Sequence, residues 1–245
     1  VFIRSPHAHA RILSLSAAIA KEMPGVLDII TADDVELSKL NALKPFVQEN
    51  PNTGEAFSFV EQPLLARNVV RYQGEPVVLV VAETVAQALD ASEVVDIEFS
   101  PLPHVVNAKE AASPDSIKLN SQLDENIAVK WNTGNSQEIE NVFNSADNVV
   151  KLTVQNQRIV TNPMEPRGVV ADWNISTGRY TLYGSSQNIH VMRTCVADML
   201  GVAEALVRFI APDVGGGFGS KNFCYTEYGL IAWMSKQLRL SLIHI

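Results

Sequence analysis

Cysteines and positive charges are both scarce in this sequence. The 245 residues contain only Cys195 and Cys224, with no CxxC pair, which excludes a disulfide framework and a zinc site of the usual spacing. We expect reduced thiols and a cytoplasmic protein. Nineteen Lys and Arg stand against 27 Asp and Glu, a formal net charge of −8. This balance argues against a nucleic-acid-binding protein.

Long apolar runs and complete nucleotide motifs are missing as well. No stretch approaches the ~20 apolar residues that cross a bilayer, so we expect no membrane span. The sequence has no GxGxxG motif with an acidic ribose partner and no GxxxxGK[ST] phosphate loop. Apolar residues make up 47% of the chain, which is enough for a well-filled core.

The patterns predict a mixed α+β protein in consecutive parts. An α/β domain is expected over 1–110, a polar linker over 111–145, and the first part of a second α+β domain over 146–238. Residues 239–245, "RLSLIHI", resemble translated cloning sequence, and we exclude them from the expected fold. We also expect the chain to be a piece of a longer one.

Strand and helix patterns alternate in the first part. Val77–Ala82 is a short apolar run, typical of a strand buried on both faces. A helix follows, and its expected apolar face consists of Val85, Ala88, Leu89 and Ser92. Alternation over Val95–Phe99 predicts another strand. Val26–Ile30 predicts a strand before a helix capped by Thr31 or Asp33.

Five elements are predicted after the linker. They are an alternating strand over 149–159, a hairpin over 168–186 that turns at Gly178, an amphipathic helix over 188–202 closed by Gly201, a strand over 205–212, and a helix over 225–238 that is apolar around most of its circumference.

The stretch "APDVGGGFGSK", residues 211–221, lies between the last predicted strand and helix. Glycines there permit positive φ and let another group approach the backbone closely. Amide groups at a helix start attract anions such as phosphate. A tight turn without any ligand explains the same residues, and both interpretations stay open at this point.

Longer segments around this loop resemble a known family. They are "NPMEPRGVVADW", "GRYTLYGSSQNIHVMRTCVADMLGV" and "VRFIAPDVGGGFGSKNFCYTEYGLIAW". Together they resemble the large, molybdenum-binding subunit of the xanthine dehydrogenase and aldehyde oxidase family, closest to bacterial carbon monoxide dehydrogenase-like and aldehyde oxidase-like members. "RSPHAHARI" and "PGVLDIITADDV" are similar to the α/β hammerhead domain of that subunit. The resemblance covers residues 1 to about 238.

The resemblance implies a molybdenum hydroxylase. Its cofactor would be molybdenum on molybdopterin, in the cytosine dinucleotide form, and it would oxidise an aldehyde, an N-heterocycle or carbon monoxide with water as the oxygen source. Electrons would pass to 2Fe–2S clusters and FAD on partner subunits, in a dimer of heterotrimers. The alternative is a non-catalytic phosphate-binding, nucleotide-binding or assembly module.

The resemblance assigns roles to five residues. Gln187 matches a glutamine whose amide lies close to a molybdenum ligand; the alternative is a residue that caps its own helix. Gly216 and Gly217 would leave room for the cofactor. Phe218 and Gly219 match the "GGGFG" loop beside the metal, where the ring would shield the site from water. An ordinary core aromatic is the alternative for Phe218.

No residue of this chain matches the catalytic base, a glutamate expected beyond residue 245. We therefore expect the chain alone, without the remaining half of its subunit, to be inactive. Asn222 stands where purine-oxidising members have a glutamate, which makes xanthine a poor substrate.

Five further residues are candidates for structural roles. Glu165 and Arg167 form either a structural ion pair or part of the substrate route. His190 is interpreted as a capping or packing residue. Cys195 and Cys224 are interpreted as core thiols.

Overall fold

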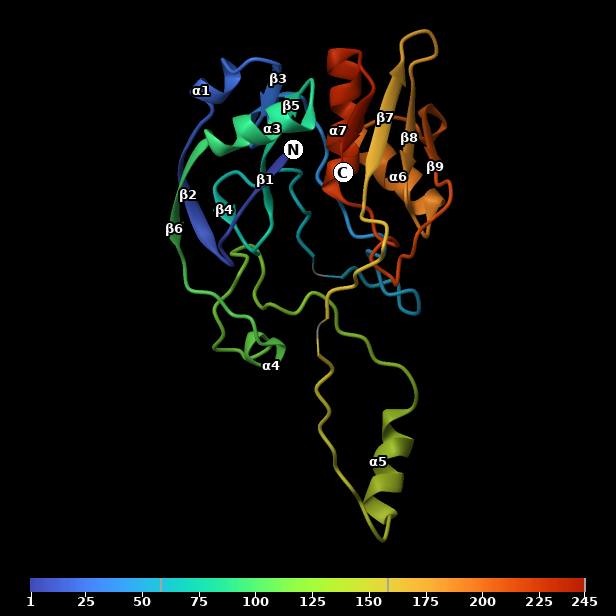
Figure 1. The fold of residues 1–245 in the computed structure, drawn as a ribbon. Helices are drawn as coiled ribbons and strands as arrows, with labels where there is room; N and C mark the ends of the chain where they lie inside the picture. The colour runs from blue at the N-terminus through green and yellow to red at the C-terminus, as the bar shows by residue number, and fades with distance from the viewer. Residues whose placement is uncertain (58, 158, 245) are drawn as a thin grey trace.

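The structure, a computed structural model, describes residues 1–57, 59–157 and 159–244. It confirms a mixed α+β fold. In Figure 1 two halves stand side by side, with helix α7 (Thr226–Leu238) between them. Every helix in the described part of the chain is too short or too polar to cross a membrane.

The first half holds two antiparallel sheets. One has the strand order β1 (Phe2–Arg4), β5 (Pro76–Ala82) and β3 (Val26–Ile30), and the other has the order β4 (Val69–Val70), β2 (Ala10–Ser16) and β6 (Asp96–Pro101). All residues of β5 from Pro76 to Val81 are buried, which confirms the predicted buried strand. In β6, Ile97 and Phe99 pack toward the core between exposed acidic residues, as the alternation predicted.

Three short helices pack against the first of these sheets: α1 (Ala18–Lys21), α2 (Ala32–Leu37) and α3 (Val85–Glu93). A fourth, α4 (Ala108–Ala111), has no buried residue and lies apart from the sheets (Figure 1). Thr31 caps α2, because its backbone N–H and hydroxyl both bind the Asp34 carboxylate at 2.8 Å. The predicted apolar face of α3 was wrong: Ala88 is buried, but Val85 and Leu89 are exposed. The small alanine side chains let α3 lie close to the sheet, which turns the larger residues outward.

The second half is one four-stranded sheet with two helices. Its strand order is β10 (Leu242–His244), β7 (Val169–Asn174), β8 (Arg179–Gly184) and β9 (Val207–Ile210). The β7–β8 hairpin is confirmed, and Gly178 has a φ of +67° in its turn. Strands β8 and β9 are parallel, so their connection crosses over through α6 (Ile189–Leu200) and the short 3₁₀ helix Glu204–Leu206. Helix α6 ends at Gly201 in the left-handed conformation, as predicted.

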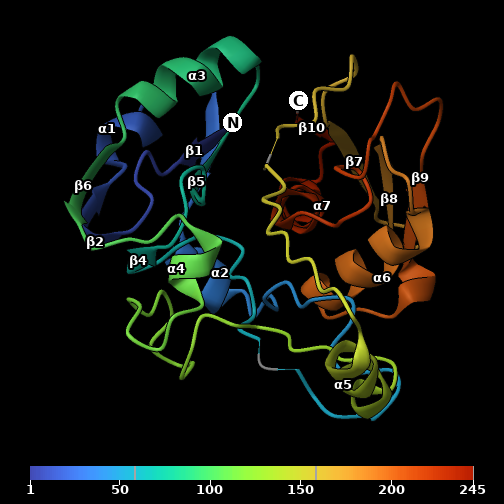
Figure 2. The ribbon, with the colours of Figure 1, turned by 90° about the horizontal axis from the view of Figure 1, so that it is seen from below.

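Helix α7 explains why the two halves pack together. Every residue from Thr226 to Ser235 is buried, which confirms the predicted buried helix. The helix belongs to one continuous core that contains Phe2 and Leu79 of the first half and Leu182 of the second. Figure 2 shows α7 from below, enclosed by both halves. Its apolar circumference therefore reflects contact on both sides rather than one amphipathic face.

The strand predicted over 149–159 is not found in its described residues, 149–157. This segment is irregular and exposed, with Val150 at 90% and Leu152 at 83% of full exposure. It extends from the body beside α5 (Ser136–Ser145), as Figure 1 shows. Alternation makes a strand only where a neighbouring strand accepts its hydrogen bonds, and none of the described strands pairs with 149–157.

The excluded segment 239–245 also differs from expectation. Leu242–His244 forms strand β10, which pairs antiparallel with β7 at Leu242 and Ala171. The Leu242 side chain is buried in the core, so excluding this segment from the fold was wrong. The boundaries at 110, 145 and 238 stay predictions.

Candidate functional site

The glycine loop connects β9 to α7, as predicted, and its backbone follows an unusual path. Three of its residues have positive φ: Gly216 (+94°), Phe218 (+49°) and Gly219 (+89°). Within the described residues, the amide groups of Gly216, Gly217 and Phe218 donate to no acceptor. Three consecutive amides without an acceptor among the described residues are available to donate hydrogen bonds to an anion.

Gln187 lies against this loop. Its side-chain Oε1 accepts a hydrogen bond of 3.0 Å from the Gly219 backbone N–H, and its backbone N–H donates to the Lys221 carbonyl oxygen at 2.9 Å. A Cβ atom at Gly217 would lie only 2.4 Å from Oε1, so the missing side chain there makes room for Gln187. The Nε2 group donates to no described residue and remains available to a ligand.

The alternative role for Gln187, capping its own helix, is wrong. The cap of α6 is Asn188, whose side chain accepts from the Val191 amide at 3.3 Å. His190 is exposed within the first turn and does not cap the helix either.

Glu165 and Lys221 fix the position of the glycine loop through an ion pair. The Lys221 ammonium lies 2.7 Å from Oε2 of Glu165 and 2.9 Å from its carbonyl oxygen. The same Oε2 accepts from the Gly215 amide at 2.7 Å and the Ser185 hydroxyl at 2.8 Å. We call these four residues the loop clamp. It joins three segments: the approach to β7, the end of β8, and the glycine loop.

The loop clamp sets the charge of Glu165. Hydrogen bonds from Lys221, then from Gly215 and Ser185, lower the pKa of Glu165 from 4.5 to about 2. The carboxylate therefore stays ionised, and the Lys221 side chain, with no exposed area, has its counter-charge. Lys221 was missed from the sequence, although a lone cation between a glycine loop and an apolar helix was a usable signal.

The predicted Glu165–Arg167 ion pair does not form. Glu165 pairs with Lys221, and the Arg167 guanidinium stacks over the Tyr225 ring at 3.5 Å from its centroid. Glu165 lies in a bend and Arg167 in an irregular segment, so the two side chains do not share a strand face and each meets a different neighbour.

Phe218 is 73% exposed, so the core-aromatic alternative is wrong. Its positive φ turns the ring out of the loop, and a Cβ at Gly216 would lie 3.1 Å from that ring. Shielding of a metal by Phe218 stays a prediction.

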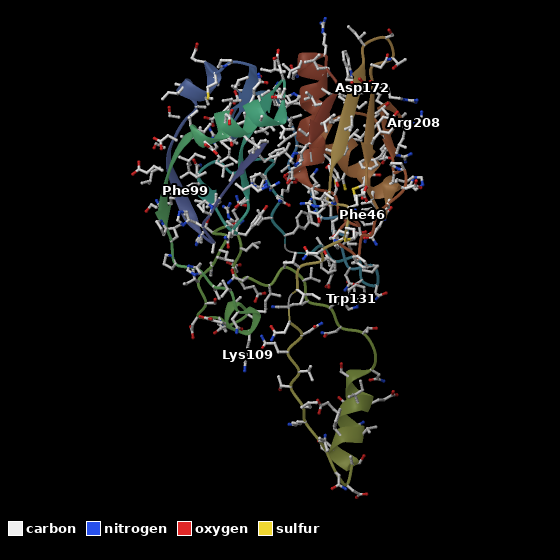
Figure 3. The ribbon with its side chains drawn as sticks, viewed as in Figure 1. Phe46, Phe99, Lys109, Trp131, Asp172 and Arg208 are labelled. Atoms are coloured by element: carbon white, nitrogen blue, oxygen red, sulfur yellow. The ribbon has the colours of Figure 1, made fainter. Side chains whose placement is uncertain are left out.

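An open cavity of about 480 Å³ adjoins the loop. Its wall begins with Asn222, Phe223 and Cys224, which directly follow the glycine loop. The remaining lining is mostly apolar and comes from the 43–62 segment, the linker and α6; it includes Phe46, Phe59, Val60, Leu123, Val191 and Cys195. Figure 3 shows Phe46 at the lower end of the second half. Both cysteines are half-buried in this wall, and Cys224 also packs against the hydrophobic core, as predicted for a core thiol.

Among residues 1–57, 59–157 and 159–244, no group of three or more His, Cys, Asp or Glu could hold a metal ion. The groups available to a cofactor are the Gln187 amide and the free loop amides.

Two protein families match the chain. Residues 119–242 match the molybdopterin cofactor-binding domain. Residues 1–103 match the aldehyde oxidase and xanthine dehydrogenase a/b hammerhead domain.

Individual relatives agree with these matches. The nicotine 6-hydroxylase large subunit of Paenarthrobacter nicotinovorans is 35% identical over 238 residues, covering 97% of this chain and 28% of the relative. The carbon monoxide dehydrogenase large chain of Afipia carboxidovorans is 32% identical, covering 93% and 28%. The structure of quinoline 2-oxidoreductase from Pseudomonas putida 86 superposes with a TM-score of 0.84 at 33% identity, over 99% of this chain and 30% of that one. The chain thus spans less than a third of the length of each.

Proposed function

This chain belongs to the xanthine dehydrogenase and aldehyde oxidase family of molybdenum enzymes, and we propose that it forms one wall of a hydroxylase active site. The observation that carries the proposal is that Gln187 is held against a loop whose Gly216–Phe218 amides have no acceptor among the described residues, and that an apolar cavity borders the residues next to both. The alternative of a non-catalytic phosphate-binding module receives no support from the matching families.

The residues present fit a molybdopterin cofactor. When bound, that cofactor supplies oxidation of a substrate carbon with the oxygen of water. The Gly216, Gly217 and Phe218 amides would donate to negatively charged or oxygen atoms of the group. Gln187 would donate through Nε2, because Gly219 already holds its Oε1 and thereby fixes the orientation of the amide. The loop clamp keeps these donors in place before the cofactor arrives, so they need no rearrangement on binding.

We propose an aromatic N-heterocycle as substrate. The support is the cavity of about 480 Å³, whose lining includes Phe46, Phe59 and Phe223 and which suits a flat apolar ring. The Asn222 amide in its wall can donate to or accept from a ring nitrogen without adding charge. Two of the compared proteins are named for nicotine and quinoline, which are such substrates.

We also propose the chemical form of the cofactor and the partner subunits. The cofactor is the cytosine dinucleotide form of molybdopterin. Electrons leave through 2Fe–2S clusters to FAD on partner subunits, in a cytoplasmic dimer of heterotrimers. The support is that the compared relatives are themselves large subunits or chains. The base that assists the hydroxylation belongs to the part of the subunit that this chain does not match.

An exchange of segments tests the proposal. The matching part of the nicotine 6-hydroxylase large subunit is replaced by this chain and expressed with the other subunits of that enzyme. We expect molybdenum incorporation and turnover of nicotine or quinoline with an artificial electron acceptor. Gly217→Val in the hybrid should lose molybdenum, because its side chain would displace Gln187 and obstruct the loop. Gly134→Val is the control: no atom lies within 4 Å of its added Cβ, so it adds backbone strain at a φ of +95° without any clash, and it should keep its molybdenum.

Different results would contradict the proposed cofactor site and the proposed substrate class. Normal molybdenum content in the Gly217→Val hybrid would contradict the cofactor site. A loaded hybrid that oxidises benzaldehyde but no N-heterocycle would contradict the substrate class alone.

A further inference from the structure

Cys195 and Cys224 lie next to each other, although they come from different elements. Cys195 is on α6, and Cys224 directly precedes Tyr225, the N-cap of α7. Both line the 480 Å³ cavity, and their side chains are close enough for a hydrogen bond between the two sulfurs. The carbonyl oxygen of Tyr225, 3.8 Å away, is a second acceptor for the Cys224 thiol.

We propose that Cys195 and Cys224 form a dithiol modification site that reacts with small disulfides such as glutathione disulfide. In the first step the Cys195 thiolate attacks one sulfur, forms a mixed disulfide and releases one glutathione thiolate. The Cys224 thiol then loses its proton and attacks the Cys195 sulfur, which releases the second glutathione. The protein loses two electrons and two protons, and glutathione disulfide is reduced to two thiols.

The surroundings assign the first attack to Cys195. The hydrogen bond from Cys224 lowers the pKa of Cys195, against the opposing effects of burial and the Asp198 charge. The same hydrogen bond, followed by burial, raises the pKa of Cys224 well above 9.0. The thiolate is the reactive form of a cysteine, so Cys195 reacts first and Cys224 resolves the mixed disulfide.

Access also favours Cys195. Besides the cavity that it shares with Cys224, it lines a second open cavity of about 320 Å³, which residues 43–46 also border. Lys44 lines both cavities, and its ammonium lies 3.5 Å from Oδ2 of Asp198, which offsets that carboxylate's repulsion of an anionic reagent. A disulfide would tie α6 to the start of α7 in the wall of the proposed substrate cavity. That consequence rests on the proposed function, whereas the thiol reaction does not.

The reaction is measured on the folded 245-residue chain without any cofactor. The reduced chain is incubated with glutathione disulfide at neutral pH, quenched in acid, alkylated, and weighed by mass spectrometry. We expect a chain two hydrogens lighter than the reduced one, with tryptic peptides 194–208 and 222–236 joined. These two residues are the only cysteines in the sequence, so every thiol is accounted for.

Single variants separate the two roles. Cys224→Ser should stop at a stable glutathione adduct on Cys195. Cys195→Ser should react about tenfold more slowly, because the remaining thiol keeps a high pKa. In denaturant both variants should react alike, and circular dichroism checks that each one folds. Equal rates in the folded variants, no reaction of the folded chain, or two adducts on the unaltered chain without an internal disulfide would each overturn the proposal.

Discussion

The Lys221 ammonium reaches 56 residues back along the sequence to bind both the carboxylate and the carbonyl oxygen of Glu165, at 2.7 and 2.9 Å. No part of the Lys221 side chain is exposed, whereas Glu165 retains 38%. The cation therefore depends on this one partner, and the anion can still be hydrated. Because Lys221 ends the glycine loop, the pair fixes the loop's position relative to β7.

This asymmetry predicts unequal effects of removing each partner. Glu165→Gln leaves a buried ammonium without its counter-charge, and we expect a fall in melting temperature of about 4 °C or more. Lys221→Met leaves a carboxylate that water can reach, so its effect should be smaller. Thermal unfolding of both variants at pH 7 measures the difference. A larger loss in Lys221→Met would contradict the assignment.

The pKa of Glu165 predicts a loss of stability in acid. Its folded value of about 2 lies below its ordinary value of 4.5, so the ionised form is favoured by folding. The contribution is complete above pH 4.5 and disappears as the pH falls from 4.5 toward 2. Urea unfolding at pH 6 and pH 3 should show a steeper loss for the unaltered chain than for Glu165→Gln. Parallel curves would show that Glu165 is not held ionised by the clamp.

Contact between Gly217 and Gln187 is tested by a double substitution. Gly217→Ala should push the Gln187 side chain away and break its bond to the Gly219 amide, lowering the free energy of unfolding by about 1 kcal/mol. In a Gln187→Ala background the same change should be nearly neutral, because the clash is gone. Urea unfolding of the four proteins gives the coupling. Additive effects would mean that the two residues do not touch.

Phe218 is expected to contribute to the site and not to stability. Phe218→Gly relieves a left-handed conformation that costs roughly 1–2 kcal/mol, and it adds unfolded-state freedom worth roughly 0.5–1 kcal/mol. We therefore expect the free energy of unfolding to stay within about 1 kcal/mol of the original. Cofactor loading of the segment-exchange hybrid should fall if the ring shields the site. A marked loss of stability would place the ring in the core after all.

The polar linker predicts where proteases cut. Residues 111–157 are mostly exposed and irregular outside α5, whereas β5 is buried throughout. A protease of broad specificity should therefore cut first between 111 and 157 and leave 77–99 intact. Mass spectrometry of the earliest fragments locates the cuts. Early cleavage within 77–99 would contradict the proposed division.

Local patterns were sufficient for much of the fold. The apolar run of β5, the hairpin turn at Gly178 and the end of α6 at Gly201 each depend on a few neighbouring residues, so the sequence predicted them. Gln187 and the glycine loop were predicted as site residues from a family motif in consecutive segments, and that role stays a prediction. The backbone φ values and the cap at Asn188 then distinguished between the alternatives.

Contacts between distant residues were decided only by the tertiary structure. Apolar and polar residues alternate in 149–157, which has no partner strand among those described, just as they do in strands that pair. The alternation therefore does not say whether a partner strand exists. The tail became strand β10 because β7 offered it a free edge. Lys221 and Glu165, like Cys195 and Cys224, come together only when β8, α6 and α7 pack. Periodicity shows which side chains of a segment share an apolar face. Which residues that face packs against depends on the fold as a whole.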